Sequence, residues 1–477
     1  MSFASTPARP HLENQAAQSS GSRFSWLWLA IVPLAALFRF LYLSRKSIYL
    51  DEALSVAYAH LSWHDFIQVL RTGEANMAFY YLLLREMVLI GDSEFWVRLP
   101  SVIAGVATVP VVYVLGSKLY DRRTGLLCSL LLSVNACHVV FSQEARGYAL
   151  ALLLITLSSW LFISGMESPS WKIWSAYAVV SALAVNSHFY AGLVLVAQWL
   201  SLLVLPRRMV PLKHFVGALL ILAVLISPAV LFVLWHSQGR INWVPPIGWL
   251  ELYHTAIFLT SEGGKLAGNL LLVLFLIALA VAAKASLRAE PPLQRWKELF
   301  PWSWLLAPML ITALGSIWVP MFFHRFLIVC LPAFVLLVAR GLTTLRPATA
   351  WIAAYVALSI VTVFSSYSRT RENWRDATHF VLSEAQPGDA IWFYRGYSDT
   401  PFYYYESRSP AENRPERVPN DNAIALSSKK RLWAILYPVG PPDVVAKESD
   451  LTQRYPVLEQ TTFHGVRIVL FNVNSSW

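Results

Sequence analysis

The sequence predicts an all-α polytopic membrane protein with a small C-terminal α/β domain outside the membrane. Of its 477 residues, 56% are hydrophobic and only 14% are charged, whereas a soluble domain carries about 25% charged residues. The hydrophobic residues gather in runs of roughly 20, which is the length that a helix needs to cross a bilayer. After residue 366 the composition changes, because arginine, acidic residues and proline return.

Apolar runs divide the chain into about eleven predicted membrane spans. The first run is too long for the core of a signal peptide and lacks a small-residue cleavage site, so we expect it to stay in the membrane. The polar residues 1–22 are expected to form a disordered cytoplasmic tail, and residues 23–366 the membrane domain. The predicted spans are residues 24–43, 97–117, 125–141, 148–165, 173–187, 189–205, 214–235, 267–284, 302–320, 325–341 and 349–366.

The short apolar stretch Met77–Ile90 decides the orientation of the spans that follow it. As a helix it would be roughly 21 Å long, against about 30 Å of hydrocarbon, and it carries Arg85 and Glu86. If it crossed the membrane, the later basic loops would lie outside, against the preference of lysine and arginine for the cytoplasmic side. We therefore interpret it as one of two juxtamembrane helices in a first outer loop, residues 44–96. The second is an amphipathic helix earlier in that loop.

The C-terminal residues 367–477 are predicted to form an extracytoplasmic α/β domain, and the N-terminus then lies in the cytoplasm. Helices are expected at 372–384 and 443–454, and strands at 390–394, 432–437 and 466–472. The net charge of +10 is explained by cytoplasmic loops, and no basic patch with interleaved aromatics indicates nucleic-acid binding. The cysteines all fall in apolar runs and show neither a disulfide framework nor metal-binding spacing.

Polar groups gather on the predicted outer side of the membrane, where the first outer loop contains the adjacent carboxylates Asp51 and Glu52. Ionisable residues at a membrane are candidates for function by default. Each also has a structural alternative: Asp51 as the N-cap of a helix, Glu144 and Arg146 as an ion pair, and Arg325 snorkelling to the interface. The outer-side group comprises Asp51, Glu52, Glu74, Asn76, Gln143, Glu144, Arg146, His188, Tyr190, His324 and Arg325.

An ordered set of short motifs runs through residues 39–385. They read IYLDEALSVAYA, FYYLLL followed by SEFWVRLPSVIAG, SQEARGYALALLL, SHFYAGLVL, HRFLIVCLPAFVLL and ENWRDATHFVL. This set resembles bacterial glycosyltransferase family 39, the relatives of protein mannosyltransferases and of the aminoarabinose transferases that modify lipid A. The resemblance implies a GT-C membrane glycosyltransferase with an acidic motif in its first outer loop and a polyprenyl-phosphate sugar as donor.

In the reaction that this resemblance implies, an acceptor hydroxyl attacks the anomeric carbon and the lipid phosphate leaves, with inversion. A carboxylate can take the acceptor proton, and we predict Asp51 as that base, with Glu52 orienting it or binding a cation. Guanidinium groups suit the leaving phosphate, so Arg146, His324 and Arg325 are predicted to bind it. The predicted substrate-binding residues are Glu74, Asn76, Tyr80, Tyr81, Gln143, Glu144, Tyr148, His188 and Tyr190.

A divalent metal ion is left open as a cofactor, with Asp51, Glu52 and Glu74 as its candidate ligands. The family often has a His-Pro-Pro segment before the FYYLLL-like run, where this chain has Asn76-Met77-Ala78. Asparagine is a much poorer metal ligand than histidine. The expected partners are the polyprenyl-phosphate sugar, membrane lipid, and a glycan, lipid or protein acceptor, at the inner (plasma) membrane.

Two other function classes compete with the enzyme. Many spans can also enclose the pathway of a transporter or flippase for a lipid-linked or polar substrate. Transporters usually place polar residues near the bilayer midplane and often contain repeats, and neither feature is visible in the sequence. A non-catalytic assembly protein that uses its C-terminal domain is the third class, but binding alone needs no base such as Asp51.

Overall fold

The computed structural model describes residues 30–236, 243–263, 265–369, 371–419, 421 and 429–474. The predicted disordered tail, and the start of the first predicted span, lie outside these residues. The chain forms two compact units. We call Met1–Leu41, Val102–Ser142 and Tyr148–Phe364 the helical unit, and Tyr42–Ser101, Gln143–Gly147 and Ser365–Trp477 the mixed unit. The mixed unit thus joins the first outer loop to the C-terminal domain, whereas the predicted domain boundary at residue 366 separates them.

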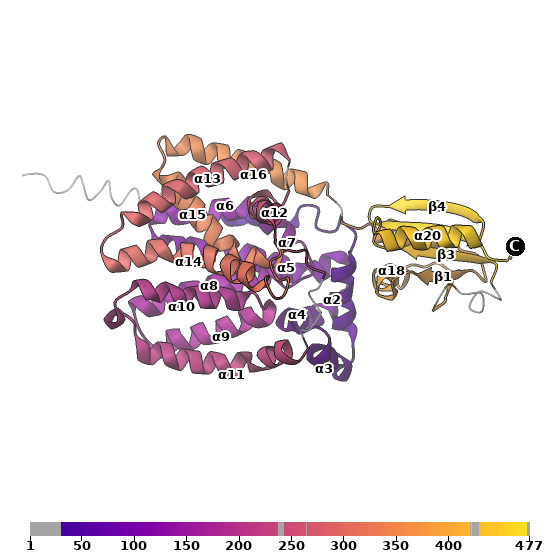
Figure 1. Cartoon of the computed structure of the whole chain (residues 1–477), viewed down its shortest axis with the longest axis horizontal. Coiled ribbons are helices and arrows are strands. Elements are labelled where there is room, and N and C mark those ends of the chain that lie inside the picture. Colours follow the sequence, from indigo (N-terminus) through magenta and orange to yellow (C-terminus); the bar gives the residue numbers. More distant parts are fainter. Residues whose placement is uncertain are drawn as a thin grey trace, which may run out of the picture. The chain divides into compact units, whose positions relative to one another are not determined.

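Long apolar helices make up the helical unit (Figure 1). A first helix covers Ala30–Phe40, and α5 (Glu94–Leu119) passes from the mixed unit into the helical one. The others are α6 (Arg122–Ser133), α7 (Ala136–Ser142), α8 (Tyr148–Glu167), α9 (Trp171–Ser187), α10 (Ala191–Ser201), α11 (Leu212–His236), α12 (Trp249–Ser261), α13 (Leu266–Leu287), α14 (Pro292–Gly315), α15 (Leu331–Thr344) and α16 (Ala348–Tyr367). Short 3-10 turns cover Leu202–Val204, Arg207–Met209 and Phe326–Cys330.

Six of these helices in the described part of the chain are long and apolar enough to cross a membrane, and the bent pair α6–α7 would make seven. On α11, Leu220, Val224 and Leu234 are 65–73% exposed, which is the surface expected of a helix that faces lipid. Two further apolar helices, Ala30–Phe40 and Ala191–Val204, are shorter. The chain is therefore a multi-pass membrane protein by length and composition, while the count of about eleven spans stays a prediction.

The first outer loop contains three short helices, α2 (Leu50–His60), α3 (Trp63–Thr72) and α4 (Ala78–Val88). The 11 residues of α4 extend roughly 16 Å, too short to cross the hydrocarbon core. The amphipathic helix predicted before it is instead two helices, because the chain turns at Leu61 and the Ser62 side chain caps α3 by accepting the Asp65 N–H. The prediction of two juxtamembrane helices is therefore corrected to three.

In the described residues of the C-terminal part of the mixed unit, drawn in yellow tones in Figure 1, a five-stranded sheet packs with three α-helices. The strand order is β2-β1-β3-β5-β4, with β1 parallel to β2 and β3, and β5 antiparallel to β3 and β4. The strands are β1 (Ala390–Phe393), β2 (Glu416–Arg417), β3 (Arg431–Leu436), β4 (Val457–Phe463) and β5 (Val466–Asn472). The helices are α17 (Trp374–Glu384), α18 (Asp399–Glu406) and α20 (Pro442–Arg454).

The central strand β3 explains how the sheet is covered on both faces. Its alternate residues Leu432, Ala434 and Leu436 share a buried cluster with Val444 and Leu451 of α20. Side chains alternate between faces along a strand, and Trp433 accordingly packs on the other face, with its ring 5.9 Å from that of Phe380 on α17. The sequence predicted β1, β3, β5, α17 and α20, and missed β2, β4 and α18.

Candidate functional site

Helix α2 carries the Asp51–Glu52 pair at its start. The helix begins at Leu50, so Asp51 is its second residue and the alternative of an Asp51 N-cap is wrong. Two other carboxylates accept hydrogen bonds from the first N–H groups instead. Glu52 Oε2 accepts from the Tyr49 N–H at 3.4 Å, and Glu372 Oε2 accepts from the Leu50 N–H at 3.0 Å. Asp51 is therefore not needed to start the helix.

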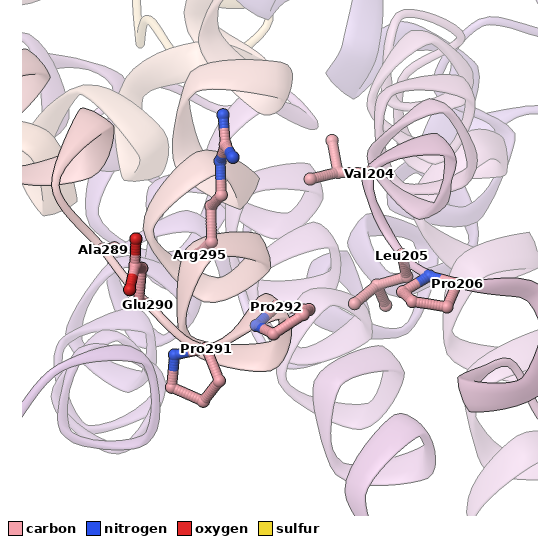
Figure 2. Close-up of a pocket in the computed structure, with 8 residues that line it drawn as sticks. All are labelled: Val204, Leu205, Pro206, Ala289, Glu290, Pro291, Pro292 and Arg295. Atoms are coloured by element: carbon pink, nitrogen blue, oxygen red, sulfur yellow. The ribbon is translucent and has the colours of Figure 1, made fainter.

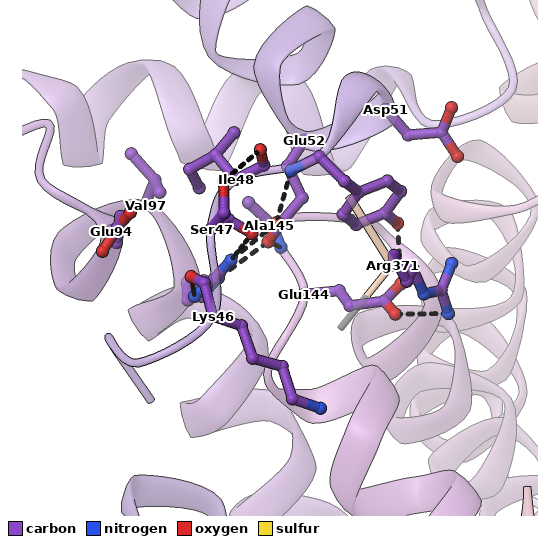
Figure 3. A network of polar contacts seen from close by, with 12 residues as sticks. Lys46, Ser47, Ile48, Asp51, Glu52, Glu94, Val97, Glu144, Ala145 and Arg371 are labelled. Carbon is purple, nitrogen blue, oxygen red and sulfur yellow. Dashed lines mark hydrogen bonds and ion pairs between the residues drawn. The ribbon is translucent and has the colours of Figure 1, made fainter. Parts of the chain in front are cut away.

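Glu52 forms a two-point ion pair with Arg98 inside the protein. Arg98 Nε donates to Glu52 Oε1 at 2.8 Å and Nη2 donates to Oε2 at 2.7 Å, and the two side chains are only 3% and 1% exposed. The Ala145 N–H also donates to Oε1 at 2.8 Å, a contact that Figure 3 shows. Arg98 further donates to the backbone carbonyls of Leu43 and Lys46. The pair therefore fixes α2 against α5 and the 143–147 loop.

Asp51 differs from its neighbour in environment. It is half-buried, whereas Glu52 is buried, and in Figure 3 its carboxylate points away from the Glu52 contacts. Burial raises the pKa of Glu372 and of Tyr437, and the negative charge of the nearby Asp51 raises both pKa values further. Of the two adjacent carboxylates, Asp51 is thus the more exposed one.

Glu144 is bonded to two other segments of the mixed unit. It accepts a hydrogen bond from the Tyr49 hydroxyl at 2.8 Å and forms an ion pair with Arg371 at 2.5 Å. The Arg371 guanidinium also lies 4.9 Å from the centre of the Tyr49 ring. Glu144 therefore links the start of α2 to the segment that follows the last apolar helix.

Arg146 lies beside Tyr81 and α2. Its Nη1 donates to the Tyr81 hydroxyl at 3.1 Å and to Ser55 Oγ at 3.4 Å, and Arg146 itself is half-buried. Burial raises the pKa of Tyr81; the Arg146 charge lowers it, and the charges of Glu74 and Asp51 raise it. The structure therefore brings Asp51, Glu74 and Arg146 within electrostatic reach of one tyrosine.

Other predicted substrate-binding residues of the mixed unit are less accessible. Tyr80 is fully buried and shares a hydrogen bond of 2.9 Å with Ser101 Oγ. Gln143 is 7% exposed, while Asn76 is half-buried. Tyr80 and Gln143 are therefore buried packing residues of the mixed unit.

The helical unit holds the remaining predicted residues. His188 is fully buried, with its ring 5.3 Å from that of Tyr148 and 5.6 Å from that of Tyr190. The Arg325 guanidinium lies 5.8 Å from the centre of the Tyr148 ring and 5.9 Å from that of Phe141. An aromatic cluster therefore surrounds His188 and Arg325 within this unit.

His324 is next to a carboxylate that the sequence reasoning missed. Its Nδ1 lies 3.9 Å from Glu251 Oε2, and Glu251 Oε1 lies 3.6 Å from His254 Nδ1. Burial lowers the pKa of His324, helped by Arg325 and His254, while Glu251 opposes the shift. His324 therefore favours its neutral form near pH 7.

The predicted metal ligands are the carboxylates of Asp51, Glu52 and Glu74. Among the described residues, no three His, Cys, Asp or Glu side chains come close enough to hold a metal ion. Both oxygens of Glu52 are already hydrogen-bonded to Arg98. Asp51, Glu52 and Glu74 thus do not fit a shared metal centre, and we derive no chemical step through one.

Residues 75–235 match the family model of dolichyl-phosphate-mannose-protein mannosyltransferases. The predicted family resemblance is confirmed. The chain is also similar in structure to ArnT from Cupriavidus metallidurans bound to undecaprenyl phosphate, with a TM-score of 0.61 and 12% identity over 94% of this chain and 98% of that chain. No curated protein matched the sequence.

A second similar structure is the oligosaccharyltransferase AglB from Archaeoglobus fulgidus, in complex with an inhibitory peptide and a dolichol-phosphate. Its TM-score is 0.58, with 11% identity over 87% of this chain and 70% of that chain. Both proteins are GT-C glycosyltransferases. At such low identity the likeness shows the fold alone, and this chain has the GT-C fold.

A surface hollow in the helical unit of this GT-C chain lies apart from the predicted residues (Figure 2). It is formed by two loops that were predicted to be cytoplasmic. Its walls are Val204, Leu205, Pro206, Ala289, Glu290, Pro291, Pro292 and Arg295. None of these was predicted as a site residue, and prolines and aliphatic side chains supply most of the lining.

Three charged residues around Asp51 were missed by sequence reasoning. Arg98 is a single arginine in the apolar motif EFWVRLPS and was not predicted as a site residue. Glu372 is the first residue of the motif ENWRDATHFVL and Arg371 directly precedes it, and that motif contributed only to the family resemblance. An isolated charge in an apolar motif was the available signal for Arg98.

Proposed function

We propose that this protein is a membrane glycosyltransferase that moves a sugar from a polyprenyl-phosphate donor to an extracytoplasmic acceptor. The family match and the GT-C fold support a glycosyltransferase. The lipid phosphates bound to the two similar structures support a donor of this class. The observation that carries the proposal is the placement of Asp51 and Arg146, both half-buried, on either side of Ser55, whose hydroxyl donates to the Asp51 carbonyl at 2.8 Å and accepts from Arg146 Nη1 at 3.4 Å.

In the proposed reaction, Asp51 takes the proton from the acceptor hydroxyl. The hydroxyl oxygen forms a bond to the anomeric carbon while the bond from that carbon to the phosphate oxygen breaks. The electron pair leaves with the polyprenyl phosphate, and the configuration at the anomeric carbon inverts. Proton transfer to a positioned carboxylate contributes typically about 10²–10⁴-fold to a rate.

Arg146 is the proposed partner of the leaving phosphate in the mixed unit. A guanidinium offers several donors in one plane and binds phosphate through charge-assisted hydrogen bonds. Such a group stabilises the transition state because the phosphate gains charge as the bond breaks. Arg325 and His324 stay proposed donor-binding residues, with neutral His324 donating or accepting a hydrogen bond.

We assign Glu52 a different role from Asp51. Its oxygens are hydrogen-bonded to Arg98 and to the Ala145 N–H, so it is a positioning residue that holds the start of α2. This interpretation removes Glu52 from the set of candidate bases and metal ligands. It also explains why two adjacent carboxylates occur: one holds the helix and the other faces the reactants.

The charge distribution supports a reaction on the outer side of the inner membrane. With the basic loops in the cytoplasm, the first outer loop and the C-terminal domain lie outside and the N-terminus inside. The short α4 supports this orientation, because a helix of that length does not add a membrane crossing.

The test uses the purified full-length chain in lipid vesicles with defined polyprenyl-phosphate sugars and an envelope fraction as acceptor source. We expect release of free polyprenyl phosphate together with transfer of the labelled sugar, and NMR of the product showing the inverted anomer. A protein that consumes no donor but moves sugar or lipid across the vesicle membrane is a transporter, and the proposal is then wrong.

A further inference from the structure

The segment 371–375 comes shortly after the last apolar helix, α16, and its side chains contact the loops that carry the candidate site. Arg371 pairs with Glu144 at 2.5 Å. Arg375 forms an ion pair with Glu94 and donates to the Ser44 carbonyl at 2.9 Å. Between these two arginines lies Glu372, whose carboxylate accepts a hydrogen bond from the first residue of α2.

Each oxygen of Glu372 has a defined donor. Oε2 accepts from the Leu50 N–H at 3.0 Å and from Trp374 Nε1 at 2.7 Å, and Oε1 accepts from the Tyr437 hydroxyl at 2.8 Å. Leu50 is the first helical residue of α2 and precedes Asp51 directly. A carboxylate at this place stabilises the helix start through the exposed N–H groups and the helix dipole.

The contacts of Glu372 link the C-terminal sheet to Asp51. Tyr437 follows β3 directly, because that strand ends at Leu436. A continuous path therefore runs from β3 through the Tyr437 hydroxyl and the Glu372 carboxylate to the start of α2. A second tie lies nearby, where the Tyr405 hydroxyl of α18 accepts a hydrogen bond from the Ile48 N–H at 2.7 Å.

We propose that Glu372 is a positioning residue for Asp51, through which the C-terminal domain holds the candidate base in place for sugar transfer. This inference rests on the proposed function, because it assumes that Asp51 takes the acceptor proton. The C-terminal domain then serves the reaction directly, by completing the helix on which the base is carried, in addition to any contact with the acceptor.

The experiment compares Glu372→Gln, Glu372→Ala and Tyr437→Phe in the full chain, with Asp443→Asn as the matched control. Asp443 is a carboxylate of the same domain that contacts Arg395 and Tyr394 and not α2. We expect kcat to fall about 10-fold in Glu372→Gln and further in Glu372→Ala, with the donor KM within about twofold of wild type.

A second readout does not depend on activity. Hydrogen exchange of the amides at the start of α2 should be about 10-fold faster in Glu372→Ala than in the control, and Tyr437→Phe should lie between them. Wild-type exchange, or wild-type kcat in an active Glu372→Gln enzyme, would overturn the inference. A wild-type chain that transfers no sugar contradicts the proposed function instead, and hydrogen exchange still tests the positioning.

Discussion

Glu52 and Arg98 lie 46 residues apart in the sequence and meet through two hydrogen bonds of 2.8 and 2.7 Å in the interior of the mixed unit. Because both side chains are buried, neither charge has water as a substitute partner. This relationship separates the roles of the adjacent carboxylates, since it occupies Glu52 and leaves the reactant-facing position to Asp51.

Breaking this pair should destabilise the protein strongly. Removing one partner of a buried ion pair leaves an uncompensated charge and typically costs about 3–5 kcal/mol. We expect Glu52→Leu and Arg98→Met each to lower the thermal unfolding midpoint. In the double variant the midpoint should fall by much less than the sum of the two single decreases. The coupling is measured by unfolding in detergent, with Asp399→Asn, at an exposed pair with Arg417, as the control. Additive losses would show that the pair is not a unit.

Arg146 should affect catalysis more than folding. If it stabilises the departing phosphate, Arg146→Ala should reduce kcat/KM by roughly 10²–10³-fold, as loss of one electrostatic donor does in other enzymes. Arg146→Lys should recover only part of this, because an ammonium lacks the planar set of donors. Arg417→Lys in the C-terminal domain is the control. Equal activity of Arg146→Ala and wild type would remove Arg146 from the donor site.

His324 should make stability depend on pH in the weakly acidic range. Its pKa is lowered by burial, while an unfolded histidine titrates near about 6.5. The unfolded chain therefore binds the proton first, and stability is lost as pH falls from about 6.5 toward the lowered value. Unfolding midpoints at neutral pH and at about pH 5.5 should differ less in His324→Gln than in wild type. His64→Gln, at an exposed histidine, should change nothing; an unchanged difference in His324→Gln would contradict the prediction.

Chelation should leave sugar transfer within about twofold of its untreated rate. The physical reason is the Glu52–Arg98 pair, which takes up the carboxylate oxygens that a metal ion at Asp51 and Glu74 would need. The measurement is the transfer rate after extensive dialysis against EDTA, with magnesium or manganese added back. A loss of activity that either ion restores would show that a metal site forms with the substrate.

The sequence predicted the elements of this protein better than their contacts. The length and charges of Met77–Ile90 were enough to identify α4 as a short helix, and alternating apolar residues located β5 at Val466–Asn472. Strand β4 was missed because most of its residues are exposed and polar, so it carries no apolar pattern. The break between α2 and α3 depends on a local cap at Ser62.

The candidate site depends on contacts between distant segments, which local patterns do not encode. Asp51–Glu52 was recognisable as an acidic pair, but the division of roles required Arg98. Glu144 forms an ion pair with Arg371, which comes after the last apolar helix. Glu372 reaches Leu50 across 322 residues of sequence. Such pairs follow from the fold, and no spacing rule relates them.

The rate of sugar transfer by Asp51→Asn tests the central claim most directly. Asparagine keeps the shape of the side chain and cannot take the acceptor proton, so kcat should fall by about 10²–10⁴-fold, with the donor KM and the unfolding midpoint close to wild type. Asp376→Asn, in the cap of α17, should retain full activity as a control. Wild-type turnover by Asp51→Asn, with a defined polyprenyl-phosphate sugar, would show that Asp51 is not the base.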